Sequence, residues 1–390
     1  MRLLYISNEA LMQKTGYGTC IRGHRKILEK LLGSRLTEYM IGAAGTPLET
    51  GPVRVFSSKK NRVTEKIRSV LQGLPSYYPP DVCARACEIV REEKITAVYI
   101  DNSVSGVLIR ALKRQDPKLR VISFFHDIEA VWMREQCRTD AWFRRPAYAA
   151  MIRGEMLTVR HGDCNIVLNE RDARLFRQVY GKDPEAELPV VLEMDPPERT
   201  AEAGGRHIAG TPLQLLFIGA EYGPNLEGLR WFLRQVMPRL EGRAELTIAG
   251  LRMEKYREEL EGMAPGVTVA GTVEDLEPYY EAADAVIAPI SAGGGMKVKT
   301  GEALARGKIL VSLPEGLEGW IDTVPEGLEG RILFCCKDAE EFRQALESLQ
   351  GQTFARRQPA LTGWMYRTYS ADAAAERYRR ILQIGEREDE

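Results

Sequence analysis

The segment with the clearest chemical pattern is the glycine-rich run from Ser291 to Met296, which follows a short apolar stretch and leads into a helical pattern at 297–306. Consecutive glycines let a ligand approach the backbone closely, and the first N–H groups of a helix attract an anion. Lys297 and Lys299 add positive charge in the same turn. These features predict a cradle for the phosphates of a nucleoside diphosphate. The alternative is an ordinary strand-to-helix turn with two solvated lysines.

Glu302 lies one turn further along the same helical pattern. A carboxylate at this place can accept hydrogen bonds from both hydroxyls of a ribose, whereas an isolated Glu302 would be a surface residue. Beside the phosphate cradle, the ribose-binding interpretation is favoured. The candidate nucleotide-binding residues of this segment are Gly294, Gly295, Met296, Lys297, Lys299, Thr300 and Glu302.

His126 follows the apolar stretch Leu119–Phe125, which has the pattern of a β-strand. Ligands of open α/β sheets bind where the strands end, so a histidine at this place can hydrogen-bond a sugar hydroxyl. The alternative is a histidine satisfied within its own domain. Asp127 either orients His126 or caps the following helix, and the cap is favoured. His126 and Asp127 are the candidate catalytic residues.

A second glycine pair, Gly16 and Gly18, lies between the first predicted strand and a predicted helix. The pair fails as a dinucleotide-binding fingerprint, because Ile21 occupies the position of the third glycine. The spacing from Gly301 to Lys308 also misses that of the phosphate-binding loop of nucleoside triphosphatases. Both of these enzyme classes are therefore disfavoured.

Alternating strand and helix patterns position these residues. Short β-rich apolar stretches alternate with amphipathic ones through both halves of the chain, which predicts two doubly wound parallel sheets. The predicted strands lie at 2–7, 37–43, 96–101, 119–125, 164–168, 213–219, 244–250, 266–270, 284–289, 309–312 and 331–335. The predicted organisation is a Rossmann-like domain at 1–195, a linker at 196–212, a second such domain at 213–362, and a C-terminal helix at 363–390 that packs back on the first domain.

The run from Pro289 to Ser312 resembles the nucleotide-sugar motif of the family 4 retaining glycosyltransferases, and the run from Phe217 to Leu240 is similar to the opening of their C-terminal domain. The resemblance implies the GT-B fold, in which two Rossmann-like domains flank an interdomain cleft and a C-terminal helix crosses back. It also implies a nucleoside diphosphate sugar as donor, retention of the anomeric configuration and no metal cofactor. The lack of an Asp-x-Asp triplet agrees with the last point.

The resemblance also assigns roles to single residues. Glu302 matches the second motif glutamate, expected on the ribose, and Gly294 replaces the first, which in many members contacts the donor sugar. Ala220 and Asn225 stand where many members carry arginine and lysine, so Lys297 and Lys299 become the candidates for phosphate charge. Outside the glycine-rich segment, the candidate donor-binding residues are Gly16, Gly18, Gly219 and Asn225.

The two halves of the chain differ in charge. Residues 1–190 carry 31 Lys and Arg against 22 Asp and Glu, and the remainder carries 23 against 33. A basic half attracts an anionic partner such as a phosphorylated lipid or an acidic glycan, and a merely solvated surface is the alternative. Nucleic acid is an unlikely partner on this pattern, because no recognised binding motif accompanies the charge.

Two basic segments suggest peripheral contact with a membrane. The stretch Ser58–Leu74 is amphipathic and could lie on an anionic bilayer, although an amphipathic helix docked on its own domain is favoured. The second segment is the arginine cluster formed by Arg134, Arg138, Arg144, Arg145 and Arg153. No apolar run is long enough to span a bilayer, and the first residues lack the apolar stretch of a signal peptide. The predicted location is the cytoplasm, with the inner face of the membrane as an additional place.

The predicted function is that of a retaining hexosyltransferase-type glycosyltransferase. It would move a sugar from a nucleoside diphosphate to a glycan, lipid-linked or small-molecule acceptor, in bacterial polysaccharide or glycoconjugate biosynthesis. Two alternatives stay open. One is an inactive GT-B-like protein that binds a nucleotide sugar or a partner, and the other is a sugar-nucleotide epimerase of GT-B fold.

Overall fold

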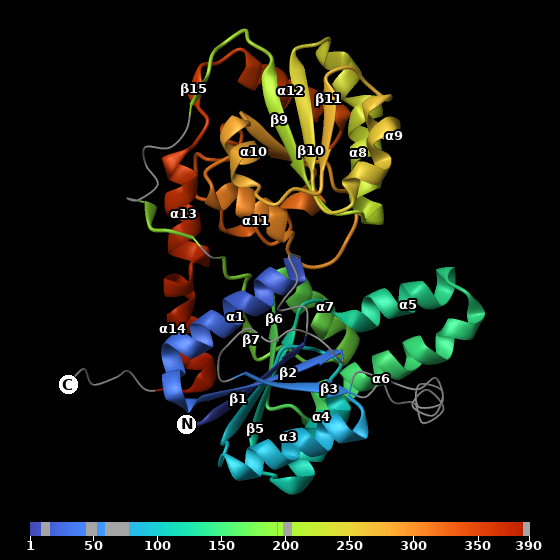
Figure 1. The fold of residues 1–390 in the computed structure, drawn as a ribbon, viewed down its shortest axis with the longest axis vertical. Coiled ribbons are helices and arrows are strands. Elements are labelled where there is room, and N and C mark those ends of the chain that lie inside the picture. The colour runs from blue at the N-terminus through green and yellow to red at the C-terminus, as the bar shows by residue number, and fades with distance from the viewer. Residues whose placement is uncertain (9–15, 44–52, 59–77, 193, 198–204, 385–390) are drawn as a thin grey trace, which may run out of the picture. The chain divides into compact units, whose positions relative to one another are not determined.

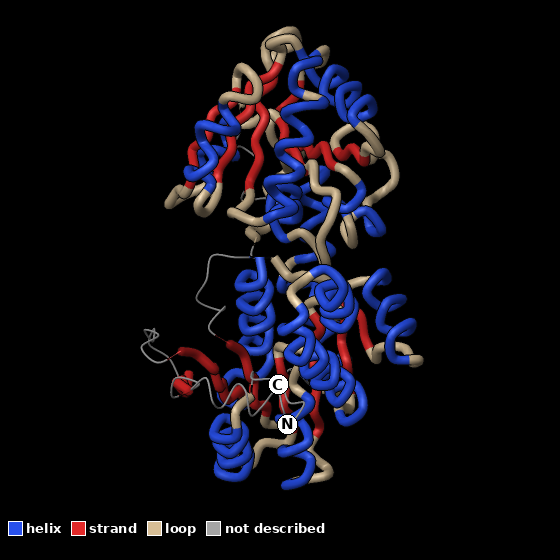
Figure 2. The backbone as a smooth tube through the Cα atoms, turned by 90° about the vertical axis from the view of Figure 1, so that its right-hand side faces the viewer, coloured by secondary structure: helices blue, strands red, loops and turns tan. Residues whose placement is uncertain are grey.

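A computed structural model describes residues 1–8, 16–43, 53–58, 78–192, 194–197 and 205–384 of the 390-residue chain. The chain divides into two compact units, of which unit 1 comprises Met1–Val191 and Ala374–Glu390, and unit 2 comprises Leu192–Ala373. In each unit, helices pack around a sheet (Figures 1 and 2). Both sheets are parallel, as predicted from the alternation of strand and helix patterns.

Unit 1 is built on a seven-stranded parallel sheet of order β3-β2-β1-β4-β5-β6-β7. Strands β4 and β6 are buried along their whole length and β4 is continuously apolar, which is the pattern of a parallel sheet covered on both faces. The order reverses between β1 and β4, and the carboxyl ends of such neighbouring strands are where open sheets bind ligands. The strands are β1 (Leu3–Asn8), β2 (Leu36–Ala43), β3 (Val53–Ser58), β4 (Ala97–Ile100), β5 (Arg120–Phe125), β6 (Cys164–Val167) and β7 (Ala186–Glu187).

The helices of unit 1 begin and end at residues with recognisable signals. The last helix before β7 begins after Asn169, whose side chain accepts a bond from the N–H of Asp172, and ends at Gly181 in the left-handed conformation. The helices are α1 (Gly16–Leu32), α3 (Pro80–Glu92), α4 (Gly106–Gln115), α5 (Glu129–Thr139), α6 (Arg145–His161), α7 (Glu170–Tyr180) and α14 (Ala371–Leu382), with a short 3-10 helix, η3 (Trp142–Arg144), between α5 and α6.

Unit 2 is built on a six-stranded parallel sheet of order β11-β10-β9-β12-β13-β14. The strands are β9 (Leu213–Ile218), β10 (Ala244–Ala249), β11 (Val267–Gly271), β12 (Ala285–Ala288), β13 (Ile309–Ser312) and β14 (Leu333–Cys335). The helices are α8 (Gly223–Gln235), α9 (Arg257–Glu261), α10 (Glu277–Ala282), α11 (Val298–Ala305), α12 (Ala339–Gln350) and α13 (Pro359–Tyr369).

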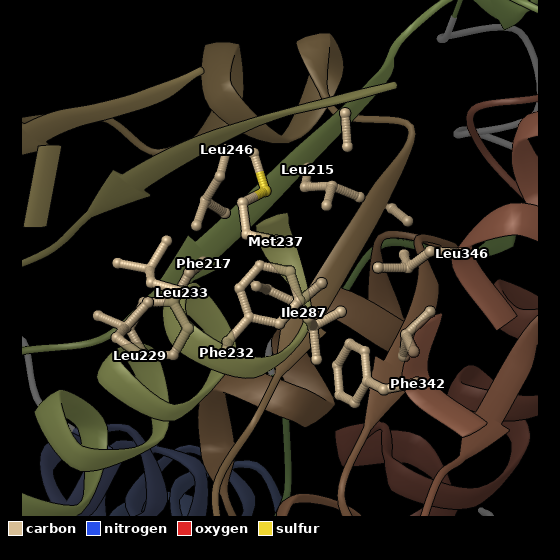
Figure 3. Close-up of a cluster of buried hydrophobic side chains, with 14 of the residues drawn as sticks. Leu215, Phe217, Leu229, Phe232, Leu233, Met237, Leu246, Ile287, Phe342 and Leu346 are labelled. Atoms are coloured by element: carbon tan, nitrogen blue, oxygen red, sulfur yellow. The ribbon is translucent and has the colours of Figure 1, made fainter. Parts of the chain in front are cut away.

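The core of unit 2 lies between its sheet and the helices α8 and α12 (Figure 3). Leu229, Phe232 and Leu233 lie on one face of α8 and meet Phe217 of β9. Apolar residues at this spacing fall on one side of a helix, and their burial against apolar strands stabilises the unit. This packing fixes the ends of β9 and β12, where the predicted nucleotide-binding residues lie.

The C-terminal tail differs from the single helix predicted from residue 363. It contains α13, which already begins at Pro359, and α14, and the two are separated at Ser370, whose backbone is extended. The Ser370 hydroxyl accepts a bond from the N–H of Ala373 at 3.1 Å and so caps the second helix. The chain passes from unit 2 to unit 1 within the first residues of α14.

Several short elements were absent from the sequence prediction. They are β3 and β7 in unit 1, and an antiparallel pair of β8 (Arg206–His207) with β15 (Phe354–Ala355) in unit 2. Strand β8 lies inside the predicted linker 196–212. It is held there in part by buried His207, whose Nδ1 lies 3.0 Å from Asp284 Oδ2. Such a contact joins distant parts of the chain and leaves no local pattern.

Candidate functional site

The glycine-rich turn of unit 2 joins β12 to α11, as predicted. Gly293 has a φ of +137° and Gly295 has a φ of +58°, backbone conformations that residues with a Cβ rarely adopt. The helix then begins after Lys297, whose side chain makes no capping bond. The first N–H groups of α11 are therefore not satisfied by a side-chain cap, which is the arrangement that favours an anion.

Lys297 is engaged by the turn itself. Its ammonium donates to the carbonyls of Gly294 at 3.1 Å and Gly295 at 3.0 Å, and forms an ion pair of 2.7 Å with Glu315. These bonds hold the turn closed over the lysine side chain. In this geometry Lys297 supports the backbone of the turn.

Lys299 lies against the end of β9 and the start of α8. Its ammonium donates to Asn225 Oδ1 and lies 4.8 Å from the centre of the Phe217 ring. Asn225 in turn donates to the carbonyl of Ala220 at 2.9 Å. Burial, followed by the nearby charge of Lys297, lowers the pKa of Lys299 to about 7. An anion that paired with this ammonium would restore its charge.

Gly219 belongs to the same cluster. A Cβ at this position would lie 2.8 Å from the Phe217 ring and 2.9 Å from Asn225 Nδ2. The structure thus brings Gly219 and Asn225, which are close in the sequence, together with Lys299, which lies 74 residues after Asn225. A larger residue than glycine here would displace the amide that holds Lys299.

The remaining candidates in α11 have different surroundings. Thr300 is buried, and its hydroxyl donates to the carbonyl of Gly316 at 2.8 Å. Met296 is buried, and Glu302 is half-buried one turn further along. Burial, followed by the Glu302 carboxylate, raises the pKa of Tyr280. Thr300 and Met296 shape the turn, while Glu302 is accessible for a ligand.

His126 of unit 1 belongs to a buried polar cluster. The imidazole Nε2 lies 2.6 Å from Asp101 Oδ1, and the other carboxylate oxygen lies 3.0 Å from His24 Nδ1. Tyr5 donates its hydroxyl to Asp101 Oδ2 at 2.5 Å, and Cys20 Sγ lies 3.5 Å from His24 Nε2. His126 keeps about 15% of its side chain exposed, whereas Asp101 and His24 are fully buried. His126 is therefore the part of the cluster that a ligand can reach.

The charges of this cluster are set by its two imidazoles and one carboxylate. Burial disfavours every charged form, but the Asp101 carboxylate outweighs it and raises the pKa of His126 to about 9. Against burial, His24 and His126 keep the pKa of Asp101 well below its usual range. At neutral pH, His126 is consequently an imidazolium that donates hydrogen bonds.

Asp101, His24 and Cys20 were not predicted as site residues. Asp101 follows β4, which pairs with β5 through Ile100 and Ser123, so the residues that follow these two strands meet at one edge. The signal was present, because Asp101 and His126 each end a predicted apolar strand. His24 stands four residues after Cys20 on one face of α1.

The same residues have the types and spacing of a metal site. The ligand atoms of His24, Asp101 and His126 lie within 4.8 Å of one another. In the present arrangement each carboxylate oxygen already receives one imidazole nitrogen, as in a hydrogen-bonded network. Both carboxylate oxygens of Asp101 thus have hydrogen-bond partners without an ion.

Asp127 does not cap α5, which corrects the favoured prediction. The residue before the helix is Ile128, and no side chain caps from that position. The N–H groups of Glu129 and Ala130 instead donate to the buried carboxylate of Glu155 on α6, at 3.0 and 2.7 Å. Glu155 of the neighbouring helix α6 thus accepts the capping bonds that were expected to go to Asp127.

Gly16 and Gly18 were predicted in a loop before a helix starting at residue 20. In the structure they lie in the first turn of α1, which begins at Gly16, and Gly18 is buried. Their predicted contact with a donor phosphate stays a prediction. Apart from Ser58, the amphipathic stretch Ser58–Leu74 lies outside the described residues.

The comparison with protein families matches only a part of the chain that lies within unit 2. Residues 212–352 match the family model described as Glycosyl transferases group 1. An uncharacterised 44.6 kDa protein from the cps region of Klebsiella pneumoniae is 32% identical over 116 residues, which cover 27% of this chain and 30% of that protein. The matched region therefore spans less than a third of that relative.

Solved structures are similar over nearly the whole chain. HepE of Anabaena in complex with UDP has a TM-score of 0.65 at 13% identity, covering 98% of this chain and 100% of that chain. The apo form of the lipopolysaccharide outer core galactosyltransferase WaaB has a TM-score of 0.65 at 11% identity, covering 98% and 99%. The trehalose-6-phosphate synthase OtsA has a TM-score of 0.63 at 14% identity, covering 99% of both chains. None of the helices in the described ranges is long and apolar enough to cross a bilayer.

Proposed function

We propose, from the premise that the chain carries a group 1 glycosyl transferase domain on a GT-B fold, that it transfers a sugar from a nucleoside diphosphate donor to an acceptor. The observation that carries the proposal is the β12–α11 turn, where an uncapped helix N-terminus belongs to the same turn as the half-buried Lys299. Both groups favour a diphosphate, the leaving group of such a transfer.

In this proposal unit 2 binds the donor. The first N–H groups of α11 and the Lys299 ammonium bind the diphosphate, and Asn225 positions Lys299. Lys297 keeps the turn in shape through its bonds to the glycine carbonyls. Glu302 accepts the hydroxyls of the ribose. UDP bound to HepE, a protein of the same fold, supports a nucleotide ligand of this class.

The charge of His126 favours retention of configuration. An imidazolium with a pKa of about 9 is a poor general base at neutral pH, so in this proposal His126 is not the base that activates the acceptor. It can donate a hydrogen bond to a hydroxyl of the transferred sugar. We therefore infer that the acceptor arrives on the face from which the diphosphate leaves, and that this diphosphate takes the acceptor proton.

The acceptor in this proposal is a glycan, a lipid-linked molecule or a small molecule held by the basic unit 1. The cps-region relative supports a place in bacterial polysaccharide or glycoconjugate biosynthesis. We propose that the reaction takes place in the cytoplasm, where a peripheral contact with the inner face of the membrane would bring a lipid-linked acceptor within reach. The chemistry assigned to Lys299 and α11 needs no metal cofactor.

A second candidate function is binding of a nucleotide sugar without transfer. Two observations favour it. Gly294 stands where the family has a glutamate that contacts the donor sugar, and Lys297 is already paired with Glu315. A protein of this kind would hold the nucleotide but provide less contact with the sugar.

A thermal-shift panel of nucleotide sugars tests donor binding directly. A donor at about 100 times its Kd adds roughly 2.7 kcal/mol to the free energy of unfolding, so the true donor raises Tm well above its competitors. Lys299→Met should lose most of this shift, whereas the matched surface change Lys337→Met should keep it, because the Lys337 side chain is exposed and forms its ion pair with Glu341 of α12. No shift with any nucleotide sugar would refute the proposal.

A further inference from the structure

The helical hairpin of α5, η3 and α6 in unit 1 carries an unusual surface. Figure 1 shows α5 and α6 as an antiparallel pair that reaches away from the strands of unit 1. Within the described ranges nine large hydrophobic residues are exposed, and five of them belong to this hairpin: Val131, Trp132, Trp142, Phe143 and Met156. The remaining four are scattered singly along the chain, which is ordinary for a protein surface.

The end of the hairpin is the most apolar and the most exposed part. Trp142 is 77% exposed and Phe143 is 64% exposed, and their rings meet edge to face with centroids 6.3 Å apart. They are followed directly by Arg144 and Arg145, both exposed, and the Arg144 guanidinium lies 6.0 Å from the Phe143 ring centre. We call these four residues the hairpin tip.

The charge around the hairpin tip is positive. Residues 132–153 contain five arginines and two acidic residues. The two acids, Glu135 and Asp140, lie 3.7 Å from Arg138 and 2.9 Å from Arg144, so each is partly neutralised. Arg145 and Arg153 are exposed and have no ion pair recorded within the described ranges. The surface therefore presents aromatic rings surrounded by excess guanidinium groups.

We propose that the hairpin tip docks on an anionic lipid bilayer. Trp142 and Phe143 enter the boundary between headgroups and acyl chains, where amphipathic aromatic rings are enriched, and Arg144 and Arg145 bind lipid phosphates. This inference deepens the proposed peripheral contact with the membrane and rests on that part of the proposed function, whereas its test does not depend on sugar transfer. It also locates membrane contact in a part of unit 1 other than the stretch Ser58–Leu74.

The size of the hairpin tip favours a bilayer over a protein partner. Two aromatic rings bury roughly 150–250 Å² each, well short of the ~800 Å² that each side of a stable protein interface buries. On a lipid surface the same two rings and two guanidinium groups suffice for a reversible contact.

Vesicle co-sedimentation of the full chain tests the proposal. We expect binding to vesicles of phosphatidylcholine mixed with phosphatidylglycerol, weaker binding at high salt, and little binding to phosphatidylcholine alone. Each arginine near the surface is worth about a fivefold change in affinity, so Arg144→Gln with Arg145→Gln should weaken binding roughly 25-fold. Trp142→Ala with Phe143→Ala should weaken it at least as much.

Matched controls separate the tip from general effects. Arg379→Gln with Arg380→Gln removes two exposed charges from α14 of the same unit, and Ile208→Ala removes an exposed apolar side chain, and both should bind vesicles as the unchanged protein does. Unchanged Tm in the tip variants shows that they fold, as their exposure leads us to expect. The proposal is overturned if the unchanged protein ignores anionic vesicles, if the tip variants bind normally, or if the tip variants abolish a dimer of the chain instead.

Discussion

Asp101 holds two imidazoles at once, and this position decides which protonation state His126 adopts. Its carboxylate is fully buried and receives His24 on one oxygen and His126 on the other. Removing the negative charge would take away the main group that offsets the cost of burying a charged His126, and would leave Cys20 as the smaller one. The residue thus acts through His126 and is a positioning residue for any sugar contact.

The variant Asp101→Asn tests this dependence. The pKa of His126 should fall from about 9, because burial remains and the carboxylate that raises it most is gone. The measurement is an NMR titration of the imidazole resonances. Asp183→Asn, which changes an exposed carboxylate paired with Arg177, serves as the control and should leave the His126 titration unchanged. An unaltered His126 titration in Asp101→Asn would contradict the assigned cause.

Lys299 makes donor binding depend on pH. In the free protein its pKa is about 7, so the ammonium is largely neutral above that pH. A diphosphate favours the charged form, so binding takes up a proton, and donor affinity should fall by up to about tenfold per pH unit as the pH rises above 7. Calorimetric titrations between pH 6 and 9 measure this slope.

The variant Lys299→Arg keeps its charge over the same pH range. The slope should therefore disappear in this variant even if its affinity differs, because a guanidinium titrates far above pH 9. The same pH dependence in Lys299→Arg would mean that another group takes up the proton.

Glu302 is expected to bind the ribose, and its loss should chiefly affect the nucleotide. A hydrogen bond to a charged group contributes about 1.5–3 kcal/mol, so Glu302→Ala should weaken binding of the free nucleoside diphosphate roughly 10- to 100-fold. Glu326→Ala is the matched control, since Glu326 is an exposed carboxylate of the same unit. Equal nucleotide affinity in both variants would remove Glu302 from the site.

Part of the candidate site could be predicted from local sequence and part could not. The glycines, Lys297, Lys299 and Glu302 form one continuous run, so their grouping followed from spacing alone. The partner of His126 could not be found in this way, because Asp127 is adjacent in sequence whereas Asp101 is adjacent only through the pairing of β4 with β5. Strand pairing is decided by tertiary packing.

At the scale of elements, the β12–α11 turn depends on its backbone. Gly295 adopts a φ of +58°, whereas Gly294 is not among the residues with positive φ. Gly295→Ala should therefore lower the free energy of unfolding by about 1–2 kcal/mol, and Gly294→Ala by less. Chemical denaturation of the two variants measures the difference. Equal losses would show that the left-handed conformation of the turn does not matter.

The predicted elements agree with the structure where a strand is buried over several residues, and they miss strands of only two residues. The strands β12 and β13 could be predicted from their continuous apolar runs. The strands β7 and β8 have two residues each and depend on pairing with distant strands. The start of α5 was assigned to Asp127, but Glu155 supplies its cap from another helix. The sequences on both sides of Ser370 have helical patterns, so the break between α13 and α14 could not be seen and a single helix was predicted.

At the scale of the whole molecule, the two units divide the chemistry. Unit 2 contains the group 1 glycosyl transferase match and the predicted diphosphate cradle, and unit 1 contains the imidazolium of His126 and most of the basic excess. An acidic half that contains the predicted nucleotide site and a basic half fit a protein that binds two different substrates. Both roles have to be present for sugar transfer, whereas donor binding needs only the first.

The most direct test of the central claim is release of nucleoside diphosphate from the donor that raises Tm most, measured with a lipid extract or glycan mixture as acceptor. Sugar transfer predicts release that depends on the acceptor and on His126 and Glu302, together with a product that keeps the anomeric configuration of the donor. Binding of the nucleotide sugar with no nucleoside diphosphate released under any of these conditions would contradict it, and would instead support the binding function without transfer.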